Sequence, residues 1–398
     1  MRILVLATDI FTRGGIARYT STLASSLGSM VGPENVDVLC FFDWGHSEKL
    51  PDEFQLVGMV SSSARAGVVS RLRFMFKAAL AGMKGYDLVI ANHVALAPVA
   101  AMMKRFFGTP YWVACHSVEI WWGTSRLRHA ALRNADLLLP VSLYTAEVVQ
   151  KMEGIRSSRV KVVYNAIPNS FGELLASQEA TSAYTAELKR GGPLLLSVCT
   201  LVRGNEFKGV DTVIRALPRL LEAIPDLRYA VVGEGEIRKH LENLAAETGV
   251  AESVTFVGEI PDAELAELYR GCDVFVLPSR GQVRVGTTGG EGFGRVYAEA
   301  ALAGKPVVGS RSGGASEAVI HGKTGFLVDP ESSDEVARAL LTILRDPDLA
   351  ARMGSEGKAW ALDRFSEGAL STSLRELLRP HGLKNESART LAHAGGQL

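Results

Sequence analysis

The sequence contains few cysteines and no long apolar run. Its 398 residues include four scattered cysteines, which form no Cys-x-x-Cys motif and no Cys/His cluster: Cys40, Cys115, Cys199 and Cys272. This distribution argues against a disulfide framework or a zinc site and predicts buried, reduced thiols. No uninterrupted apolar stretch reaches the roughly 18–20 residues that a membrane-spanning helix needs. The opening "MRILVLATDIF" is too short for a signal peptide and is typical of a first strand. We therefore expect a cytoplasmic protein that contacts a membrane at most peripherally.

Two ligand-binding signatures are missing, and a third occurs only once, where a helix start explains it. The sequence has no GxxxxGK[ST], which excludes a P-loop. Neither "TDIFTRGGIARYT" nor "VVGEGEIRKH" has the GxGxxG spacing, so a nicotinamide dehydrogenase is a poor fit. The only Asp-x-Asp triplet, Asp346-Pro347-Asp348, precedes a late helical pattern, where a helix-start role is favoured over metal binding. We expect no metal and no tightly bound cofactor.

Charge is balanced overall but not along the chain. The sequence has 43 basic and 43 acidic residues. Between residues 60 and 135, however, Asp87 and Glu119 are the only acids, against ten basic residues: Arg65, Arg71, Arg73, Lys77, Lys84, Lys104, Arg105, Arg126, Arg128 and Arg133. This segment suits an anionic membrane surface or an anionic acceptor, although a set of solvated helix faces explains it equally well. No nucleic-acid partner is expected.

Hydrophobic periodicity predicts an α/β protein with two doubly wound domains. Short apolar runs such as "RILVLAT" and "VKVVYNA" alternate with helical patterns, and the alternation restarts at "PLLLSVCT" after a polar stretch. Apolar strands joined by helices indicate parallel sheets covered on both faces. The predicted parts are a Rossmann-like domain, a linker, a second Rossmann-like domain, a C-terminal helix that packs back towards the first domain, and a disordered tail, at 1–173, 174–192, 193–362, 363–382 and 383–398.

Chemistry is expected where strands feed into helices, at the carboxyl ends of the sheets. After "SVCT", Arg203 and Lys208 are cations that can neutralise a diphosphate, although a solvated loop is equally compatible. Glu291 and Glu299 lie eight residues apart, a rise of about 12 Å along a helix. A glycosidase pair needs its carboxyls about 5–9.5 Å apart, so this spacing is a poor match. A ligand with two polyol ends fits better, with one carboxylate at each end.

The stretch "EGFGRVYAE" resembles the E-x7-E signature of retaining GT-B glycosyltransferases that use sugar nucleotides (family 4-like, group 1). Further segments agree in the same order over about residues 1–375: "GGI", "HSVE", "VVYNAIP", "FKG", "VVGEGE", "VFVLPS", "GSRSGGASEAV" and "HGKTGFLV". The resemblance implies a GT-B fold, in which the two Rossmann-like domains face each other across a cleft. The first domain would then bind the acceptor and the second the nucleotide-sugar.

On the donor side, the resemblance implies that Glu291 binds hydroxyls of the donor sugar and Glu299 binds the ribose of the nucleotide. Lys208 would lie on the diphosphate and stabilise the leaving group. Backbone around the first glutamate would hold the sugar and the phosphates, at Gly292, Phe293, Gly294 and Arg295. The family commonly has an arginine where Thr200 stands, and Arg203 is the replacement that we expect as a further donor ligand.

On the acceptor side, the resemblance implies that Gly14 and Gly15 bring backbone N–H groups near the acceptor, with Gly15 also near the donor phosphate. His116 would lie in the cleft near the sugar and the acceptor hydroxyl; a hydrogen-bonded histidine at a strand end is the alternative. The usual His-Gly-x-Glu pattern becomes His116-Ser117-Val118-Glu119, so Glu119 is a less secure acceptor ligand. Similarly, Asn165-Ala166 replaces the usual Asn-Gly.

The resemblance predicts a retaining, metal-independent transfer, with His116, Lys208 and Glu291 as catalytic residues. The donor phosphate itself can take the acceptor proton, which makes His116 a positioning residue rather than a base. The expected partners are a nucleotide-sugar and a glycan or lipid-linked acceptor, at the inner face of a membrane where surface polysaccharide or glycolipid is assembled. Three alternatives stay open: a GT-B-like nucleotide-sugar epimerase, a non-catalytic sugar-nucleotide-binding module and a glycosidase.

Two features bear on the choice of substrate. The aromatic group Tyr111, Trp112, Trp121 and Trp122 suits a saccharide or a lipid-phosphate-linked acceptor, but these side chains can equally belong to the core. The insertion "RGQVRVGTTGG" (280–290) is a candidate for shaping donor choice, and nothing in it identifies a sugar.

Overall fold

The computed structural model describes residues 1–12, 14–42, 52–61, 67–121, 124–177, 183–281 and 290–383. It divides into two units. The first comprises Met1–Ala114, Arg126–Leu138 and Leu370–Leu398, and the second comprises Cys115–Ser125 and Leu139–Ala369. The segments that follow the fifth and sixth strands of the first sheet, including His116 and Glu119, therefore count with the second unit.

The first sheet has six strands in the order β3-β2-β1-β4-β5-β6. Their bounds are β1 (Ile3–Ala7), β2 (Val36–Phe42), β3 (Gln55–Ser61), β4 (Leu88–Ala91), β5 (Tyr111–Cys115) and β6 (Leu137–Pro140). Strand β1 pairs in parallel with both β2 and β4. Its five residues are apolar and fully buried, as expected for a central parallel strand covered on both faces.

The second sheet repeats this topology, in the order β12-β11-β10-β7-β8-β9. Its strands are β7 (Leu194–Val198), β8 (Arg228–Val232), β9 (Val254–Gly258), β10 (Val274–Val276), β11 (Val307–Ser310) and β12 (Gly325–Val328). The first strand of the series, β7, pairs in parallel with β8 on one side and β10 on the other. The strand order thus reverses between β7 and β10, which creates the crevice where doubly wound sheets bind ligands.

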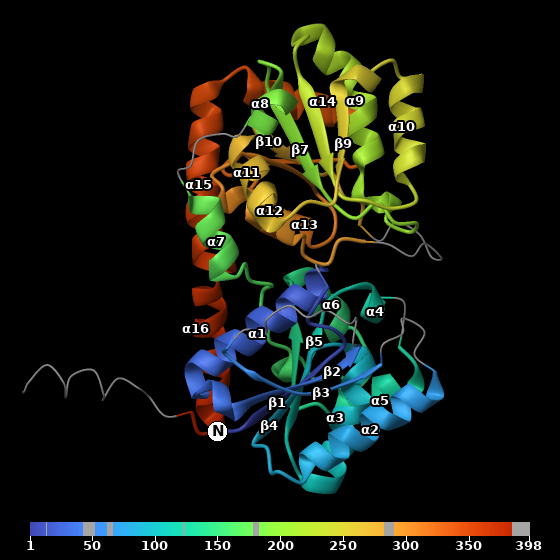
Figure 1. The fold of residues 1–398 in the computed structure, drawn as a ribbon, viewed down its shortest axis with the longest axis vertical. Helices are drawn as coiled ribbons and strands as arrows, with labels where there is room; N and C mark the ends of the chain where they lie inside the picture. The colour runs from blue at the N-terminus through green and yellow to red at the C-terminus, as the bar shows by residue number, and fades with distance from the viewer. Residues whose placement is uncertain are drawn as a thin grey trace, which may run out of the picture. The chain divides into compact units, whose positions relative to one another are not determined.

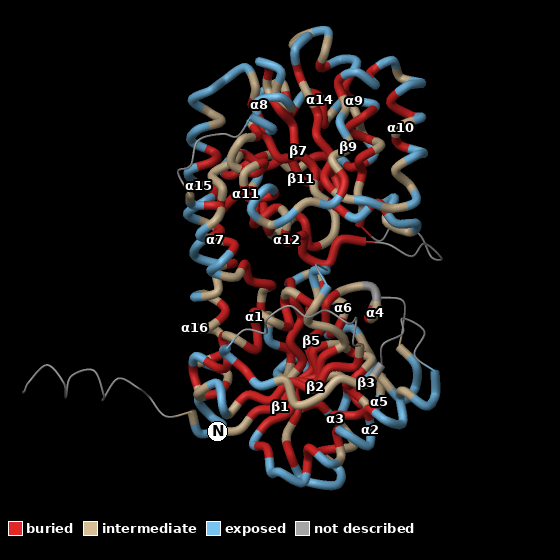
Figure 2. The backbone as a smooth tube through the Cα atoms, viewed as in Figure 1, coloured by how far each residue is buried: buried red, intermediate tan, exposed pale blue. Residues whose placement is uncertain are grey.

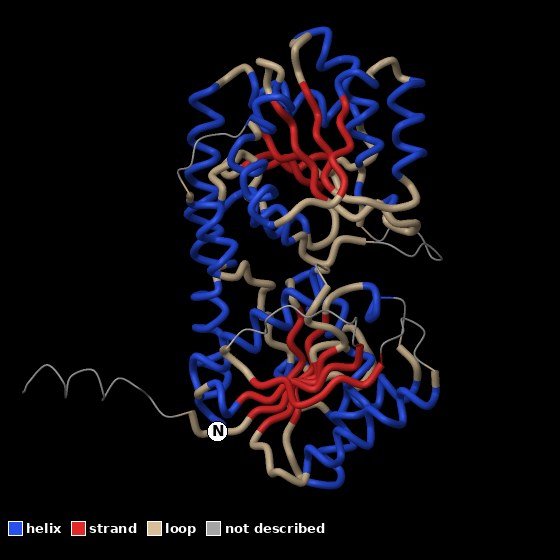
Figure 3. Tube along the Cα trace, viewed as in Figure 1, coloured by secondary structure: helices blue, strands red, loops and turns tan. Residues whose placement is uncertain are grey.

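Helices connect the strands and cover the sheets (Figures 1 and 3). In the first part of the chain they are α1 (Gly15–Val31), α2 (Val68–Gly82), α3 (Ala97–Phe107), α4 (Val118–Trp121), α5 (Arg126–Asn134), α6 (Leu143–Gln150), α7 (Asn169–Ala176) and α8 (Ala183–Lys189). Then follow α9 (Val210–Ala223), α10 (Arg238–Glu247), α11 (Asp262–Gly271), α12 (Arg295–Leu302), α13 (Ala315–Ala318), α14 (Ser333–Leu344), α15 (Pro347–Phe365) and α16 (Glu367–Leu378). Figure 1 shows α9, α10 and α14 along one side of the second sheet and α11 and α12 along the other.

Burial follows the layered architecture. In Figure 2 the strands of each sheet are buried, while the outer faces of the surrounding helices are exposed. All four cysteines are free and buried, which confirms the prediction that they are buried. Burial raises the pKa of Cys40 and Cys272 to about 12, so both remain unreactive thiols at neutral pH. Among the described residues, no helix is both long and apolar enough to cross a membrane.

Asp346-Pro347-Asp348 begins a helix, as its sequence predicts. The Asp346 carboxylate accepts a hydrogen bond of 2.9 Å from the backbone N–H of Leu349, and Pro347 occupies the first position of α15. An N-cap carboxylate followed by proline is a common helix start, because it satisfies a free N–H group and fixes the backbone angle. The structure therefore confirms the helix-start role of this triplet.

The strand predictions are right except in two places. The run "VKVVYNA" forms no strand. It is extended beside β6, with the Val163 N–H donating to Pro140 at 3.0 Å, and it buries Val160 and Val163 without a ladder. Conversely, β3 was missed, since Gly58 interrupts its apolar pattern. The proposed linker 174–192 contains the end of α7 and all of α8. The predictions for the tail beyond residue 383 and for residues 282–289 of the insertion fall outside the described residues.

Candidate functional site

Two loops of the second unit meet where its strand order reverses. The chain leaves β7 through residues 199–209 to reach α9, and leaves β10 through residues 277–294 to reach α12. Because β7 and β10 are neighbours and run in parallel, both loops emerge at the same edge of the sheet. Lys208 lies on the first loop and Glu291 on the second. The topology alone thus brings together residues that are 83 positions apart.

Lys208 and Glu291 form a partly buried ion pair. The Lys208 Nζ atom lies 2.7 Å from Glu291 Oε2, and the side chains are 18% and 9% exposed. Burial opposes the charged form of the lysine, but the nearby carboxylate outweighs it and raises the pKa of Lys208. The ammonium therefore keeps its charge throughout the neutral range. A charged, partly exposed lysine at this edge of the sheet can neutralise an anionic ligand.

The backbone around Glu291 is held by close contacts that only glycine permits. A Cβ atom on Gly292 would lie 2.5 Å from the carbonyl oxygen of His116. One on Gly314 would lie 2.0 Å from the carbonyl oxygen of Gly292, and the Gly314 N–H donates to the Glu291 carbonyl at 2.9 Å. Gly294 caps α12 in the left-handed conformation, with φ of 81°. The glycines of this motif thus fix the turn that carries Glu291.

Glu299 belongs to a second, separate ion pair. Its Oε1 accepts from Arg295 Nε at 2.8 Å, one helical turn earlier, and its Oε2 accepts from the Tyr269 hydroxyl at 2.9 Å. The Arg295 and Glu299 side chains are only 8% and 5% exposed. Each carboxylate oxygen keeps a second lone pair for a ligand hydroxyl, and the buried Nη1 of Arg295 has no hydrogen-bond partner. The two glutamates of the motif therefore hold different cations, consistent with two separate jobs.

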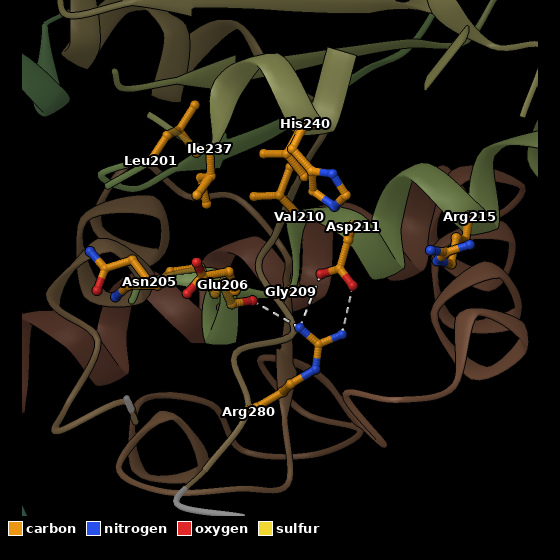
Figure 4. A pocket seen from close by; sticks show the side chains of 12 residues that line it. Leu201, Asn205, Glu206, Gly209, Val210, Asp211, Arg215, Ile237, His240 and Arg280 are labelled. Carbon is orange, nitrogen blue, oxygen red and sulfur yellow. Dashed lines mark hydrogen bonds and ion pairs between the residues drawn. The ribbon is translucent and has the colours of Figure 1, made fainter. Parts of the chain in front are cut away.

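Lys208 lines a pocket that is open to solvent. Figure 4 shows this pocket from close by. Its wall comes from the loop after β7, the first turns of α9 and α10, and the end of β10: Leu201, Asn205, Glu206, Lys208, Gly209, Val210, Asp211, Arg215, Ile237, His240, Leu241 and Arg280. Arg203, the other expected donor ligand, is exposed, and its backbone N–H donates to Glu236 Oε2 at 3.0 Å.

His116 lies beside the glycine-rich turn, but Glu119 is engaged locally. The His116 residue is 5% exposed, and its carbonyl oxygen approaches Gly292 as described above. The Glu119 carboxylate accepts from the backbone N–H groups of His116 at 2.6 Å and Ser117 at 3.0 Å. It thereby stabilises its own turn. A direct contact between Glu119 and an acceptor stays a prediction.

The first unit carries the remaining expected site residues. Gly14 and Gly15 begin α1, with Gly14 as its N-cap, and both are exposed. The aromatic group is divided: Tyr111 and Trp112 are fully buried in β5 and belong to the core. Trp122 and the side chain of Trp121 fall outside the described residues.

The side-chain contacts of two polar residues of the second unit, Arg295 and Glu317, were not predicted from the sequence. Arg295 pairs with Glu299 at the helical spacing of four, a signal that the sequence did offer. Glu317 accepts from the N–H groups of Leu143 and Tyr144 at the start of α6, both at 2.7 Å. Burial nonetheless raises the pKa of Glu317, against the effect of these donors. Only the fold brings such distant groups together.

The described residues contain no group of three or more His, Cys, Asp or Glu side chains that could hold a metal ion. The cations of the site are side chains, chiefly Lys208 beside Glu291 and Arg295 beside Glu299.

Two family models match this chain. Residues 187–360 match the model described as glycosyl transferases group 1, and residues 13–171 match glycosyltransferase family 4. Among curated proteins, the GDP-mannose-dependent alpha-(1-6)-phosphatidylinositol monomannoside mannosyltransferase of Mycolicibacterium smegmatis is 36% identical over 300 residues, covering 74% of this chain and 77% of that protein. The protein of the same name from Mycobacterium tuberculosis is 33% identical over 301 residues, covering 74% and 76%.

Among solved structures, HepE of Anabaena in complex with UDP and glucose superposes with a TM-score of 0.77. It is 23% identical, and the match covers 96% of this chain and 100% of HepE. At this identity the likeness concerns the fold, which is the two-sheet arrangement described above.

Proposed function

This chain belongs to the group 1 glycosyl transferases, adopts the GT-B fold and is a glycosyltransferase with a nucleotide-sugar donor; on this premise, we propose a retaining, metal-independent transfer of one sugar to a hydroxyl of a lipid-linked or glycan acceptor. The observation that supports the proposal most directly is the ion pair of Lys208 and Glu291, which joins the loops that follow β7 and β10. It combines a permanent cation with a hydrogen-bond acceptor where two strand ends meet.

Each member of the pair has a role when the donor binds. The diphosphate of the donor forms an ion pair with the Lys208 ammonium. Hydroxyls of the donor sugar donate hydrogen bonds to the Glu291 carboxylate. Hydrogen bonds and charge contacts to the ligand thus replace the 2.7 Å contact of the free protein. Glu299, held by Arg295 and Tyr269, accepts from the ribose hydroxyls. One donor molecule is then held at both of its polyol ends and at the charged link between them.

The reaction breaks the bond between the anomeric carbon and the diphosphate oxygen. Negative charge develops on the leaving phosphate, and Lys208 stabilises it electrostatically in a largely buried position. The acceptor oxygen attacks from the same face of the sugar, and its proton passes to the departing phosphate oxygen, so the configuration is retained. No enzyme nucleophile is needed. His116 positions the reactants, and the protein's own cations supply the positive charge that a metal ion would otherwise provide.

Relatives guide the choice of donor and acceptor. The curated relatives with 33–36% identity are named for GDP-mannose and for a phosphatidylinositol mannoside acceptor. We therefore propose GDP-mannose as the donor and a glycolipid at the inner face of the cytoplasmic membrane as the acceptor.

Binding of nucleotide-sugars tests this function. Thermal-shift and calorimetric titrations with GDP-mannose, UDP-glucose, dTDP-glucose and ADP-glucose are expected to show stabilisation by GDP-mannose above the others. At a concentration 100 times Kd, the expected stabilisation is about 2.7 kcal/mol. Stabilisation by none of the four would refute the proposed donor class. Turnover of the donor without an acceptor, and without hydrolysis, would indicate the epimerase instead.

The surface of α2 supports the proposed membrane contact. Helix α2 buries Phe74, Ala78, Ala81 and Gly82, yet its opposite face is apolar and exposed: Val68, Val69, Leu72, Met75, Phe76, Leu80 and Met83. In helical projection Arg71 flanks this face on one edge, and Arg73 and Lys77 flank it on the other. At the end of the neighbouring helix α3, Phe106 and Phe107 are exposed as well, and Phe107 lies against Gly82. An apolar face bordered by cations suits the boundary between headgroups and acyl chains of an anionic bilayer.

Charge and apolarity on α2 are expected to act together in membrane binding. Cosedimentation with vesicles of equal phosphatidylglycerol and phosphatidylcholine should fall about tenfold or more for Leu72→Glu/Phe76→Glu. Loss of one basic residue, as in Arg73→Gln, should cost about fivefold at low salt. Leu362→Glu, at an exposed apolar residue of α15, is the matched control and should bind like the wild type. Equal wild-type binding to pure phosphatidylcholine vesicles would contradict the anionic-membrane proposal.

A further inference from the structure

Arg280 lies four residues after the end of β10, on the loop that leads to Glu291. It follows β10 in the run "VFVLPSR", and its side chain is 17% exposed. Its backbone N–H donates to the carbonyl oxygen of Phe207 at 2.6 Å, although these residues are far apart in sequence. The end of β10 is thereby joined to the short 3-10 turn Glu206–Lys208, which carries the catalytic lysine.

The guanidinium of Arg280 uses all five of its N–H donors. Nε donates to Glu331 Oε1 at 2.7 Å. Nη1 donates to the Glu206 carbonyl at 2.9 Å and to Asp211 Oδ1 at 3.0 Å. Nη2 donates to Asp211 Oδ2 and to Thr212 Oγ1, both at 2.9 Å. Figure 4 shows the fork reaching Asp211 and the backbone of Glu206. A bidentate arginine–carboxylate contact of this kind fixes orientation as well as distance.

These contacts hold three segments around Lys208. Glu206 lies within the turn itself, two residues before the lysine. Asp211 and Thr212 lie in the first turn of α9, directly after it, and the Thr212 hydroxyl donates onward to the Pro330 carbonyl at 2.9 Å. Gly209, between the turn and the helix, has φ of 78°, and a Cβ there would lie 2.2 Å from the Pro278 carbonyl oxygen. The backbone on both sides of Lys208 is therefore fixed relative to the end of β10.

We infer that Arg280 is the positioning residue of the reaction, which sets the Lys208 ammonium at the place where the leaving diphosphate acquires charge. This inference rests on the proposed function. Electrostatic stabilisation of the leaving diphosphate requires that the ammonium is in place before the charge develops. The lysine side chain is a flexible four-carbon stem, so the ammonium stabilises the diphosphate weakly if the backbone that carries it also moves. Arg280 touches neither reacting atom and acts through the turn that it holds.

A double-mutant cycle with Lys208 tests the inference. Arg280→Lys keeps the charge but loses the planar fork, and Arg280→Met loses both. Affinity for the nucleoside diphosphate, GDP or UDP according to which stabilises the wild type, is expected to fall about tenfold in either variant. Affinity for the matching nucleoside monophosphate should change less than twofold if Lys208 acts mainly on the outer phosphate. In a Lys208→Met background, the same Arg280 substitutions should add less than a twofold loss.

Arg219→Met is the control variant for the Arg280 substitutions. This substitution removes a different ion pair, which joins α9 to α14 through Arg219 and Asp334 at 2.9 Å. The two side chains are 46% and 71% exposed. Arg219→Met should leave both affinities unchanged. Multiplicative losses in the double mutant, or equal losses for diphosphate and monophosphate, would overturn the positioning role and indicate a structural one. Should no nucleotide stabilise the wild type, the proposed function fails first, and the inference fails with it.

Discussion

Replacing Lys208 with methionine is expected to lower kcat/KM for sugar transfer about 10³-fold. Removal of one preorganised donor from the charge-developing atom of a reaction typically costs 10²–10³-fold, and Lys208 supplies a full charge. Methionine keeps most of the volume of the lysine stem, so the change isolates the ammonium. The measurement is steady-state transfer from the donor identified by the binding panel, with kcat and KM determined separately.

The loss of activity should exceed any effect that Lys208→Met has through the stability of the fold. The Lys208 and Glu291 side chains are 18% and 9% exposed, so separating them destabilises the fold by about 1–3 kcal/mol, which a melting curve resolves. Lys189→Met is a matched control, because Lys189 also pairs with a carboxylate of the second unit, Asp273, at 2.9 Å. If Lys189→Met lowered kcat/KM as far as Lys208→Met does, the leaving-group role of Lys208 would be untenable.

Local patterns made most of the fold predictable. Apolar strands that alternate with helical stripes predicted two parallel sheets, and the structure contains both, although the order of their strands was not predicted. Prediction was wrong where tertiary context overrode the pattern. The run around Val163 is as apolar as a strand, yet it lies extended beside β6 without a ladder of its own. Strand β3 contains Gly58 and was missed because its apolar pattern is weaker.

The sequence named Lys208, Glu291 and Glu299 as candidate site residues, but it did not predict the contacts that they make. The spacing of Glu291 and Glu299 indicated separate tasks, and each carboxylate indeed has its own cation. No local sequence pattern, however, predicts that Arg280 contacts Asp211, 69 residues away, or that Glu317 caps α6, 174 residues away. Such contacts depend on which strand ends become neighbours, and sequence periodicity carries no information about that order.

The surface of α2 is a second feature that the sequence pattern alone did not predict. Its sequence is amphipathic only in part, and a helical pattern cannot tell which of two apolar faces is buried. In the structure, Phe74 and Ala78 pack inward, while Leu72 and Phe76 are exposed. The basic residues gain meaning only from this orientation, since they border an exposed apolar face rather than a core. The composition of this segment predicted a basic surface, and the structure shows that an exposed apolar face of α2 lies beside the basic residues.

Glu291→Gln and Glu299→Gln are expected to separate sugar transfer from nucleotide binding. Glu291→Gln removes the carboxylate that competes with the diphosphate for Lys208, so the bare nucleoside diphosphate should bind as tightly as before or more tightly. Transfer should nevertheless fall about 10²–10³-fold, because the sugar loses its charged acceptor. Glu299→Gln leaves the buried Arg295 without its counter-charge, which destabilises the fold by up to about 3–5 kcal/mol.

The ribose contact adds a second effect to Glu299→Gln. Affinity for the bare nucleoside diphosphate should fall about tenfold, since the amide replaces a carboxylate that accepts from the ribose hydroxyls. Calorimetry with the nucleoside diphosphate and kinetics with the full donor measure the two effects on the same protein samples. The decisive result is that Glu291→Gln loses transfer but keeps its nucleotide affinity, whereas Glu299→Gln loses nucleotide affinity. This difference is expected because Glu291 pairs with Lys208 and Glu299 pairs with Arg295. Parallel loss of nucleotide affinity in both variants would mean that the two carboxylates serve one common subsite, and the assignment of each to its own end of the donor would be wrong.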